Sequence, residues 1–275
     1  MHERVPKDLR AAERAFARRP SMKRVFLALL LLGGCESCLK RTVVEEVTVH
    51  PAPSCDEPAE PELLAQGSLM SGPIHRERVI EHFRVEARGC LRAITVRQEW
   101  SRQITEVEAV FDDAWNPIQV WKRMSIPGVP EPEQYEDVRL YEFRNEPATM
   151  TERNAEGRTH RAFRGGQPNR LVGPGRALIT AWIQRADLEV GETDRGMALD
   201  VRELFERVDE VALRRDADRF EDDLGREVRV YTVFGRESVF ADENNIVIGD
   251  LAGLRLATDL GEAPEFRLPQ EIVGP

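Results

Sequence analysis

Apolar and polar side chains alternate along most of the chain after Pro73, as they do in strands that bury one face. Short turn-forming stretches, rather than long helical segments, interrupt this alternation. The sequence therefore predicts a mainly β domain with a large, antiparallel and curved sheet of meander or half-barrel type. The clearest alternating positions are Val79, Phe83, Val85, Ala87, Ile94, Val96, Trp100, Val107, Ala109 and Phe111.

Turn chemistry marks where the predicted strands are joined. Residues 112–117, Asp-Asp-Ala-Trp-Asn-Pro, separate two apolar runs and predict a hairpin. Asp and Asn side chains bond to nearby backbone, and Pro cannot continue a central strand. Runs at 228–234 and 238–241 predict a second hairpin, and residues 242–245 turn the chain into a further strand at 246–249.

Helical spacing occurs at two places, so we expect one or two helices beside the sheet. Residues 176–186 follow a break rich in glycine and proline, and they place four large apolar side chains on one face. Residues 200–213 fit both the helical and the strand period. We expect a helix to about Val208 and a strand after it.

The most specific stretch of the sequence lies at residues 22–35. It begins with Met22, Lys23 and Arg24, continues with eight apolar residues and ends in Gly-Gly-Cys. A basic start, a short apolar run and small residues before a cleavage point are the parts of a secretory signal. The run is much shorter than the roughly 20 residues of a membrane span. A helix packed in a core is the alternative interpretation.

This segment resembles a bacterial lipoprotein signal, with a lipobox that reads Leu32-Gly33-Gly34-Cys35. The resemblance implies a thioether-linked lipid on Cys35 and cleavage before it. Residues 1–34 are then an N-terminal extension and signal peptide, with Met22 as the expected start. Two or more acyl chains anchor a protein stably. Glu36 follows the cysteine, which favours the outer membrane, facing the periplasm.

Residues 35–72 have the composition of a flexible tether between this anchor and the β domain of residues 73–275. They combine four prolines with acidic residues and contain few large apolar side chains. Such segments stay extended and solvated. The stretch at 42–49 is an exception that could pair as a strand.

The charge of the chain limits its partners. The whole chain carries a net charge of −10, although residues 1–35 hold eight basic against three acidic residues, so the part after cleavage is near −15. An acidic domain without a basic stripe repels phosphate backbones, so we expect no nucleic-acid partner.

Three cysteines remain besides Cys35, and they are Cys38, Cys55 and Cys90. An exported chain meets an oxidising compartment, and we favour a disulfide between Cys55 and Cys90, which would tie the tether to the first strands. Unpaired cysteines that act as small apolar fillers are the alternative. The spacing is not that of a zinc site, and we predict no cofactor.

Residue patterns that would predict catalysis are not present in the sequence. The histidines after the signal, at 50, 75, 82 and 160, are not spaced as metal ligands or paired with a nucleophile. The acidic run at 216–223 lacks the spacing of a calcium loop. We therefore predict no catalytic or metal-binding residues.

Four tryptophans, at 100, 115, 121 and 182, are the side chains with the most potential for recognition. A large amphipathic ring serves both a core and a ligand surface. Val120 and Trp121 are neighbours on one predicted strand, so one of them should face outward. We expect Trp121 and Trp115 to contribute to a ligand or partner surface.

The predicted sheet is similar in pattern to the curved sheets of bacterial envelope proteins of the lipoprotein-carrier type, over residues 188–192 and the hairpins of 231–249. The resemblance implies binding on an apolar inner face. We therefore expect an envelope lipoprotein that acts as a non-catalytic binding module for an apolar ligand, an envelope component or a partner protein. The alternatives are a hydrolase that uses carboxylates in a cleft, and a structural subunit of an envelope assembly.

Overall fold

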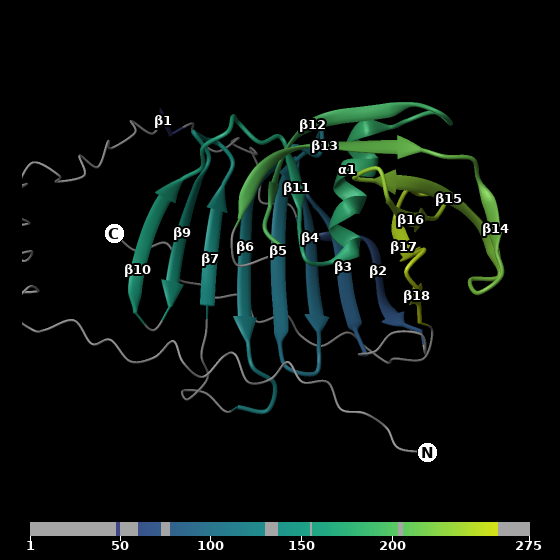
Figure 1. Ribbon diagram of the computed structural model, residues 1–275, viewed down its shortest axis with the longest axis horizontal. Helices are drawn as coiled ribbons and strands as arrows, with labels where there is room; N and C mark the ends of the chain where they lie inside the picture. The colour runs from purple at the N-terminus through teal and green to yellow at the C-terminus, as the bar shows by residue number, and fades with distance from the viewer. Residues whose placement is uncertain are drawn as a thin grey trace, which may run out of the picture. The chain divides into compact units, whose positions relative to one another are not determined.

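The computed structural model describes residues 48–49, 60–72, 78–129, 137–154, 156–202 and 206–257. Within these residues one sheet contains 16 strands, and two short strands, β1 (Thr48–Val49) and β8 (Asn145–Glu146), pair with each other (Figure 1). Every pairing is antiparallel except the one between β11 and β12. The predicted fold class, a large and mainly antiparallel sheet with little helix, is confirmed.

The first half of the sheet is a meander in which successive long strands pair with one another. The predicted hairpin forms between β5 and β6, where Asp112 Oδ1 accepts a hydrogen bond from the backbone N–H of Asn116 at 2.7 Å. The strands of this half are β2 (Glu62–Ser71), β3 (Ile80–Arg88), β4 (Leu91–Glu99), β5 (Ile104–Asp112), β6 (Pro117–Ser125), β7 (Asp137–Glu142), β9 (Thr149–Asn154) and β10 (Gly157–Ala162).

The second half joins the first through the pairing of β18 with β2. The first helical turn, η1 (Arg176–Leu178), continues into α1 (Ile179–Ala186), which confirms the helix predicted at 176–186. The strands of this half are β11 (Arg170–Val172), β12 (Thr193–Asp200), β13 (Arg207–Arg215), β14 (Arg219–Glu221), β15 (Arg226–Val233), β16 (Glu237–Ala241), β17 (Val247–Asp250) and β18 (Leu254–Leu256).

The largest apolar cluster lies on one face of β3 to β7, which we call the inner face. Ala177 and Leu178 of η1, and Leu199 and Val201 at the end of β12, belong to the same cluster. The sheet therefore curls so that its second half and its helix lie against the inner face of the first half (Figure 1). The sheet residues of the cluster include Phe83, Val85, Ile94, Val96, Val107, Ala109, Phe111, Val120 and Tyr141.

Two boundaries differ from those expected. Residues 62–71, expected to be part of the tether, form β2, because they pair with both β3 and β18. The helix expected from residue 200 to Val208 is wrong at both ends, since Asp200 belongs to β12 and Arg207 and Val208 belong to β13. Val208 pairs with Leu199 of β12, and this backbone pairing decides between the two periods that the sequence allows.

The N-terminal predictions fall largely outside the described residues. Residues 1–34, Cys35 and Cys55 are among the residues not described. Cys90, in the turn between β3 and β4, is disulfide-bonded, and its pairing with Cys55 stays a prediction. In the described part of the chain, helices are too short or too polar to cross a bilayer.

We predict that Gly175→Ala lowers the stability of the fold. A Cβ atom at Gly175 would lie 2.5 Å from Cγ1 of Val96 on β4, closer than packed atoms approach. Overpacking of this kind costs roughly 1–3 kcal/mol of the free energy of unfolding, which urea denaturation measures. Gly72→Ala is the matched control, because its new Cβ would meet its nearest neighbour at 3.6 Å. Equal stability of the two variants would contradict this packing of η1 on β4.

Candidate functional site

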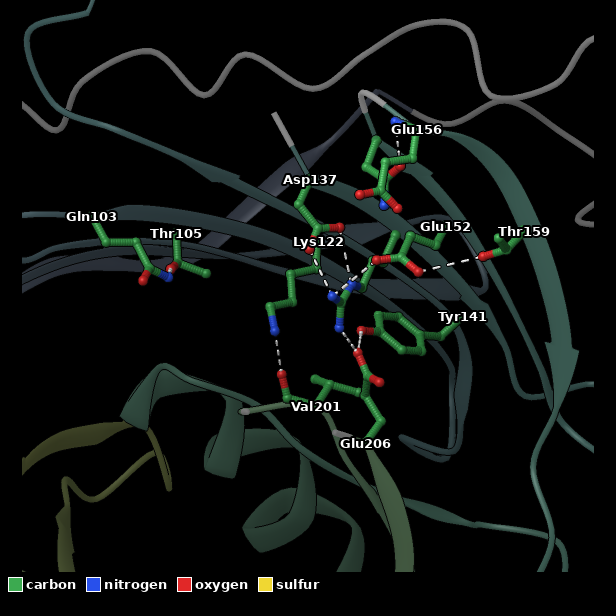
Figure 2. A network of polar contacts seen from close by, with 12 residues as sticks. Gln103, Thr105, Lys122, Asp137, Tyr141, Glu152, Glu156, Thr159, Val201 and Glu206 are labelled. Carbon is green, nitrogen blue, oxygen red and sulfur yellow. Dashed lines mark hydrogen bonds and ion pairs between the residues drawn. The ribbon is translucent and has the colours of Figure 1, made fainter. Parts of the chain in front are cut away.

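Charged side chains interrupt the apolar inner face at β6 and β7. Lys122 pairs with Val107 of β5 on one side and with Arg139 of β7 on the other, so both cations lie in an apolar row. Arg139 donates two hydrogen bonds to Asp137, at 2.6 and 3.0 Å, and one to Glu152 at 3.0 Å (Figure 2). It also forms an ion pair with Glu206.

Glu206 is the acidic centre of this network, and its side chain is fully buried. Tyr141 donates a hydrogen bond to Glu206 Oε1 at 2.8 Å, and both Arg139 and Arg161 form ion pairs with the carboxylate. Burial raises the pKa of Glu206, but the Tyr141 hydrogen bond and the Arg139 charge outweigh it, so this pKa lies below its usual value. Burial and the Glu206 charge raise the pKa of Tyr141.

Lys122 is the most confined cation of the inner face, with 1% of its surface exposed. Its Nζ donates a hydrogen bond to the carbonyl oxygen of Val201 at 2.7 Å (Figure 2). Burial, together with the nearby charge of Arg139, lowers the pKa of Lys122 to about 8. Lys122 is thus a cation without an acidic side chain in direct contact among the described residues, held beneath the end of β12.

This network fastens the chain after β12 onto β6 and β7. The carboxylates of Asp137, Glu152 and Glu206 all contact Arg139, so their charges are compensated where they lie. Among the described residues, His, Cys, Asp and Glu side chains do not gather in threes as a metal site would require. In the described part of the chain, these ion pairs join β7, β9 and the chain after β12.

A pocket of about 460 Å³ lies in the next part of the inner face, which we call the rim pocket. Two of its residues, Gln98 of β4 and Thr105 of β5, are paired in the register of the sheet. They lie on the same face as Lys122, two positions further along their strands than the pair of Val96 and Val107. The turn between these strands and two segments from the second half of the sheet complete its wall. The rim pocket is lined by Gln98, Trp100, Arg102, Gln103, Thr105, Pro174 and Arg202.

Hydrogen bonds hold the wall of the rim pocket in place. Gln98 Nε2 donates to the carbonyl oxygen of Pro174 at 3.1 Å, and Gln98 Oε1 accepts from the indole N–H of Trp100 at 2.9 Å. Gln103 Nε2 donates to Thr105 Oγ1 at 2.9 Å. The indole ring is therefore fixed by its nitrogen while 40% of Trp100 is exposed.

Glu81 on β3 supports the pocket from behind. Its buried carboxylate accepts hydrogen bonds from the backbone N–H groups of Arg176 and Ala177, at 2.9 and 2.8 Å, which places the start of η1 against the sheet. Burial raises the pKa of Glu81, and these hydrogen bonds offset only part of that rise. The adjoining segment at Pro174 is thereby kept at the pocket wall.

The two tryptophans expected at a ligand or partner surface do not line the rim pocket. Val120 is fully buried on the inner face, and Trp121 points to the opposite face of the sheet but is only 8% exposed, so the part of Trp121 and Trp115 in such a surface stays a prediction. Trp121 lies between Glu108 and Leu140 in the register of a central strand, and neighbours on both sides cover it. Trp115 sits in the turn after β5 and packs on Phe111, with ring centroids 5.8 Å apart.

The residues of the rim pocket were not predicted from the sequence as a site. One signal for them was present, because Gln98 continues the apolar positions Ile94 and Val96 of β4, and Thr105 precedes the apolar positions Val107, Ala109 and Phe111 of β5. The contributions of Pro174 and Arg202 carry no such signal. They come from segments about 70 or more positions away, which only the curl of the sheet brings near.

Comparisons with known proteins add little to this geometry. No family model and no curated protein matches the chain. A crystal structure of a DUF1089 family protein from Pseudomonas aeruginosa aligns over 62% of this chain and 88% of that protein, with 15% identity and a TM-score of 0.41. Similarity at this level supports no conclusion about function.

We predict that Lys122 makes stability depend on alkaline pH. Its pKa is about 8 in the folded protein against an ordinary 10.5, so the unfolded chain binds more protons between these values and stability rises with pH there. The gain above pH 10.5 is at most about 3.4 kcal/mol, at 1.36 kcal/mol per pKa unit.

Lys122→Met removes this titration while keeping an unbranched side chain. Urea denaturation of both proteins at pH 7, 9 and 10.5 measures the effect, and titrations common to both cancel in the difference. The free energy of unfolding of the natural protein should rise with pH relative to that of the variant. A difference that is the same at all three pH values would refute the lowered pKa.

Proposed function

We propose that this protein is a non-catalytic binding module of the bacterial envelope, anchored through a lipid on Cys35 and binding its ligand in the rim pocket. The observation that carries the binding role is the pocket itself. Its volume of about 460 Å³ lies within the roughly 300–1,000 Å³ of ligand sites. An indole ring and polar groups line it together, as in sites that bind a small molecule.

The packing of the inner face favours a ligand in the rim pocket over a ligand that lies along the inner face itself. Ala177 and Leu178 of η1 pack into the apolar cluster of β3 to β5, where an apolar ligand would otherwise lie. Over β6 and β7, the ion pairs of Arg139 and Glu206 take the corresponding space. A polar ligand in the rim pocket is therefore better supported than the apolar ligand expected from the sequence pattern.

The proposed localisation at the membrane rests on the sequence that precedes the sheet. The run that ends at Cys35 supports an anchor, and Glu36 supports the outer membrane, with the sheet in the periplasm. Residues between Cys35 and β1, whose Thr48–Val49 pair with β8, would let the sheet stand tens of ångströms from the bilayer, at roughly 3.1 Å per extended residue. The membrane is thus the proposed partner, reached through acyl chains rather than through the sheet.

We expect Cys35→Ala to release the protein from the membrane fraction or to leave it as an unprocessed precursor. The thiol is the proposed attachment point for the acyl chains, and without them an acidic chain has no affinity for a bilayer. Detergent partitioning and intact-mass measurement of the protein expressed in a bacterium test this. Cys38→Ala serves as the control. Unchanged partitioning of the Cys35 variant would disprove the anchor.

We expect a small molecule to co-purify with the full-length protein extracted in detergent from its own host. Native mass spectrometry should detect it on the natural protein and on Trp115→Ala, whose tryptophan lies outside the pocket. It should be lost from Trp100→Ala, because the ring that lines the pocket is gone. A protein without any bound molecule, or equal retention by both variants, would contradict the proposed site.

A further inference from the structure

The polar groups of the rim pocket differ in whether they already have a partner. Both ends of the Gln98 amide are engaged, by Pro174 and Trp100, and the indole N–H of Trp100 is engaged in turn. Arg202 is held by Asp200, with the closest contact at 2.8 Å, and lies over the ring of Phe234 at 4.9 Å. These groups form the wall and keep little bonding capacity for a ligand.

Three polar functions remain available. Arg102 is exposed, and within the described chain its guanidinium has no hydrogen bond or ion pair. Thr105 Oγ1 accepts the bond from Gln103, so its hydroxyl hydrogen is left to donate. Gln103 has donated through Nε2, so its Oε1 is left to accept. The free donors, including one full positive charge, outnumber the free acceptors.

The exposed part of Trp100 supplies the apolar side of the site. Its nitrogen is fixed on Gln98, so the ring can offer a ligand only its faces and edge. An indole face binds planar rings by stacking, and it binds the C–H face of saturated rings by the same apolar contact. Nearby carboxylates do not compete, since Glu81 is bound to the start of η1 and Asp200 to Arg202.

We propose that the rim pocket binds a small ring compound that carries an acid group, with the ring on Trp100 and the acid on Arg102. Thr105 donates a further hydrogen bond to the acid or to a ring oxygen, and Gln103 accepts one from a hydroxyl or amide of the ligand. Arginine matches the flat geometry of a carboxylate or phosphate with two parallel hydrogen bonds. The inference rests on the proposed binding function and specifies its ligand class.

Isothermal titration of the full-length protein with matched acid and neutral probes tests this inference. Benzoate against benzamide represents an aromatic ring, and glucuronate against glucose represents a saturated one. At least one acid should bind about tenfold more tightly than its neutral partner, since a charged hydrogen bond contributes roughly that much. The preference should shrink as salt rises, because the attraction to Arg102 is screened.

Arg102→Gln should abolish the preference for the acid while leaving the fold intact. Arg158→Gln is the matched control, because it removes an exposed arginine from β10, which lies at one end of the strand order and is separated from β5 by β9, β7 and β6. With the natural protein, the pair of probes that shows the preference for the acid, aromatic or saturated, identifies which kind of ring the indole accepts.

The two proposals fail in different ways. Equal binding of acid and neutral probes, or an acid preference that survives in Arg102→Gln, would overturn the acidic ligand while the binding module stands. A neutral molecule found on the protein by native mass spectrometry would do the same. Binding of no probe, together with no co-purified molecule, would overturn both.

Discussion

Two cations placed on an apolar surface govern how this sheet curls. Lys122 and Arg139 point from adjacent strands into the inner face, where an unpaired charge is costly. The chain after β12 gives Lys122 the carbonyl oxygen of Val201, and it adds the carboxylate of Glu206 to those of Asp137 and Glu152 around Arg139. Because Val201 and Glu206 come from the second half of the sheet, these contacts hold the chain after β12 against β6 and β7.

The rim pocket follows from the same closure. Arg202 comes directly after Val201, so the bond that satisfies Lys122 also sets one wall of the pocket. The part of the wall at Pro174 depends on Glu81, whose carboxylate holds the backbone at Arg176 and Ala177 against β3. Between two walls fixed by buried polar contacts, a site built from a turn between strands can be well ordered.

The positions of paired and unpaired charges support the proposed binding site. Among the described residues, Arg139 and Arg202 form ion pairs, whereas Arg102 at the rim pocket forms none. Arg102 therefore adds a local positive charge to a pocket that the ring of Trp100 also lines, in a chain with a net charge of −10. A tether between such a site and a lipid on Cys35 would keep the site near its membrane without the sheet touching lipid.

The sequence by itself determined the class of the fold, the hairpin at 112–117 and the helix at 176–186, because these depend on neighbours within a few positions. The resemblance of the run that ends at Cys35 to a lipoprotein signal likewise depends on local sequence alone. Only the tertiary structure decided that Val208 lies in a strand, that Trp121 is covered, and that Arg202 meets Gln98 at one pocket. Those outcomes depend on pairing and burial between segments far apart in the chain, and no local pattern records which distant strand a residue will face.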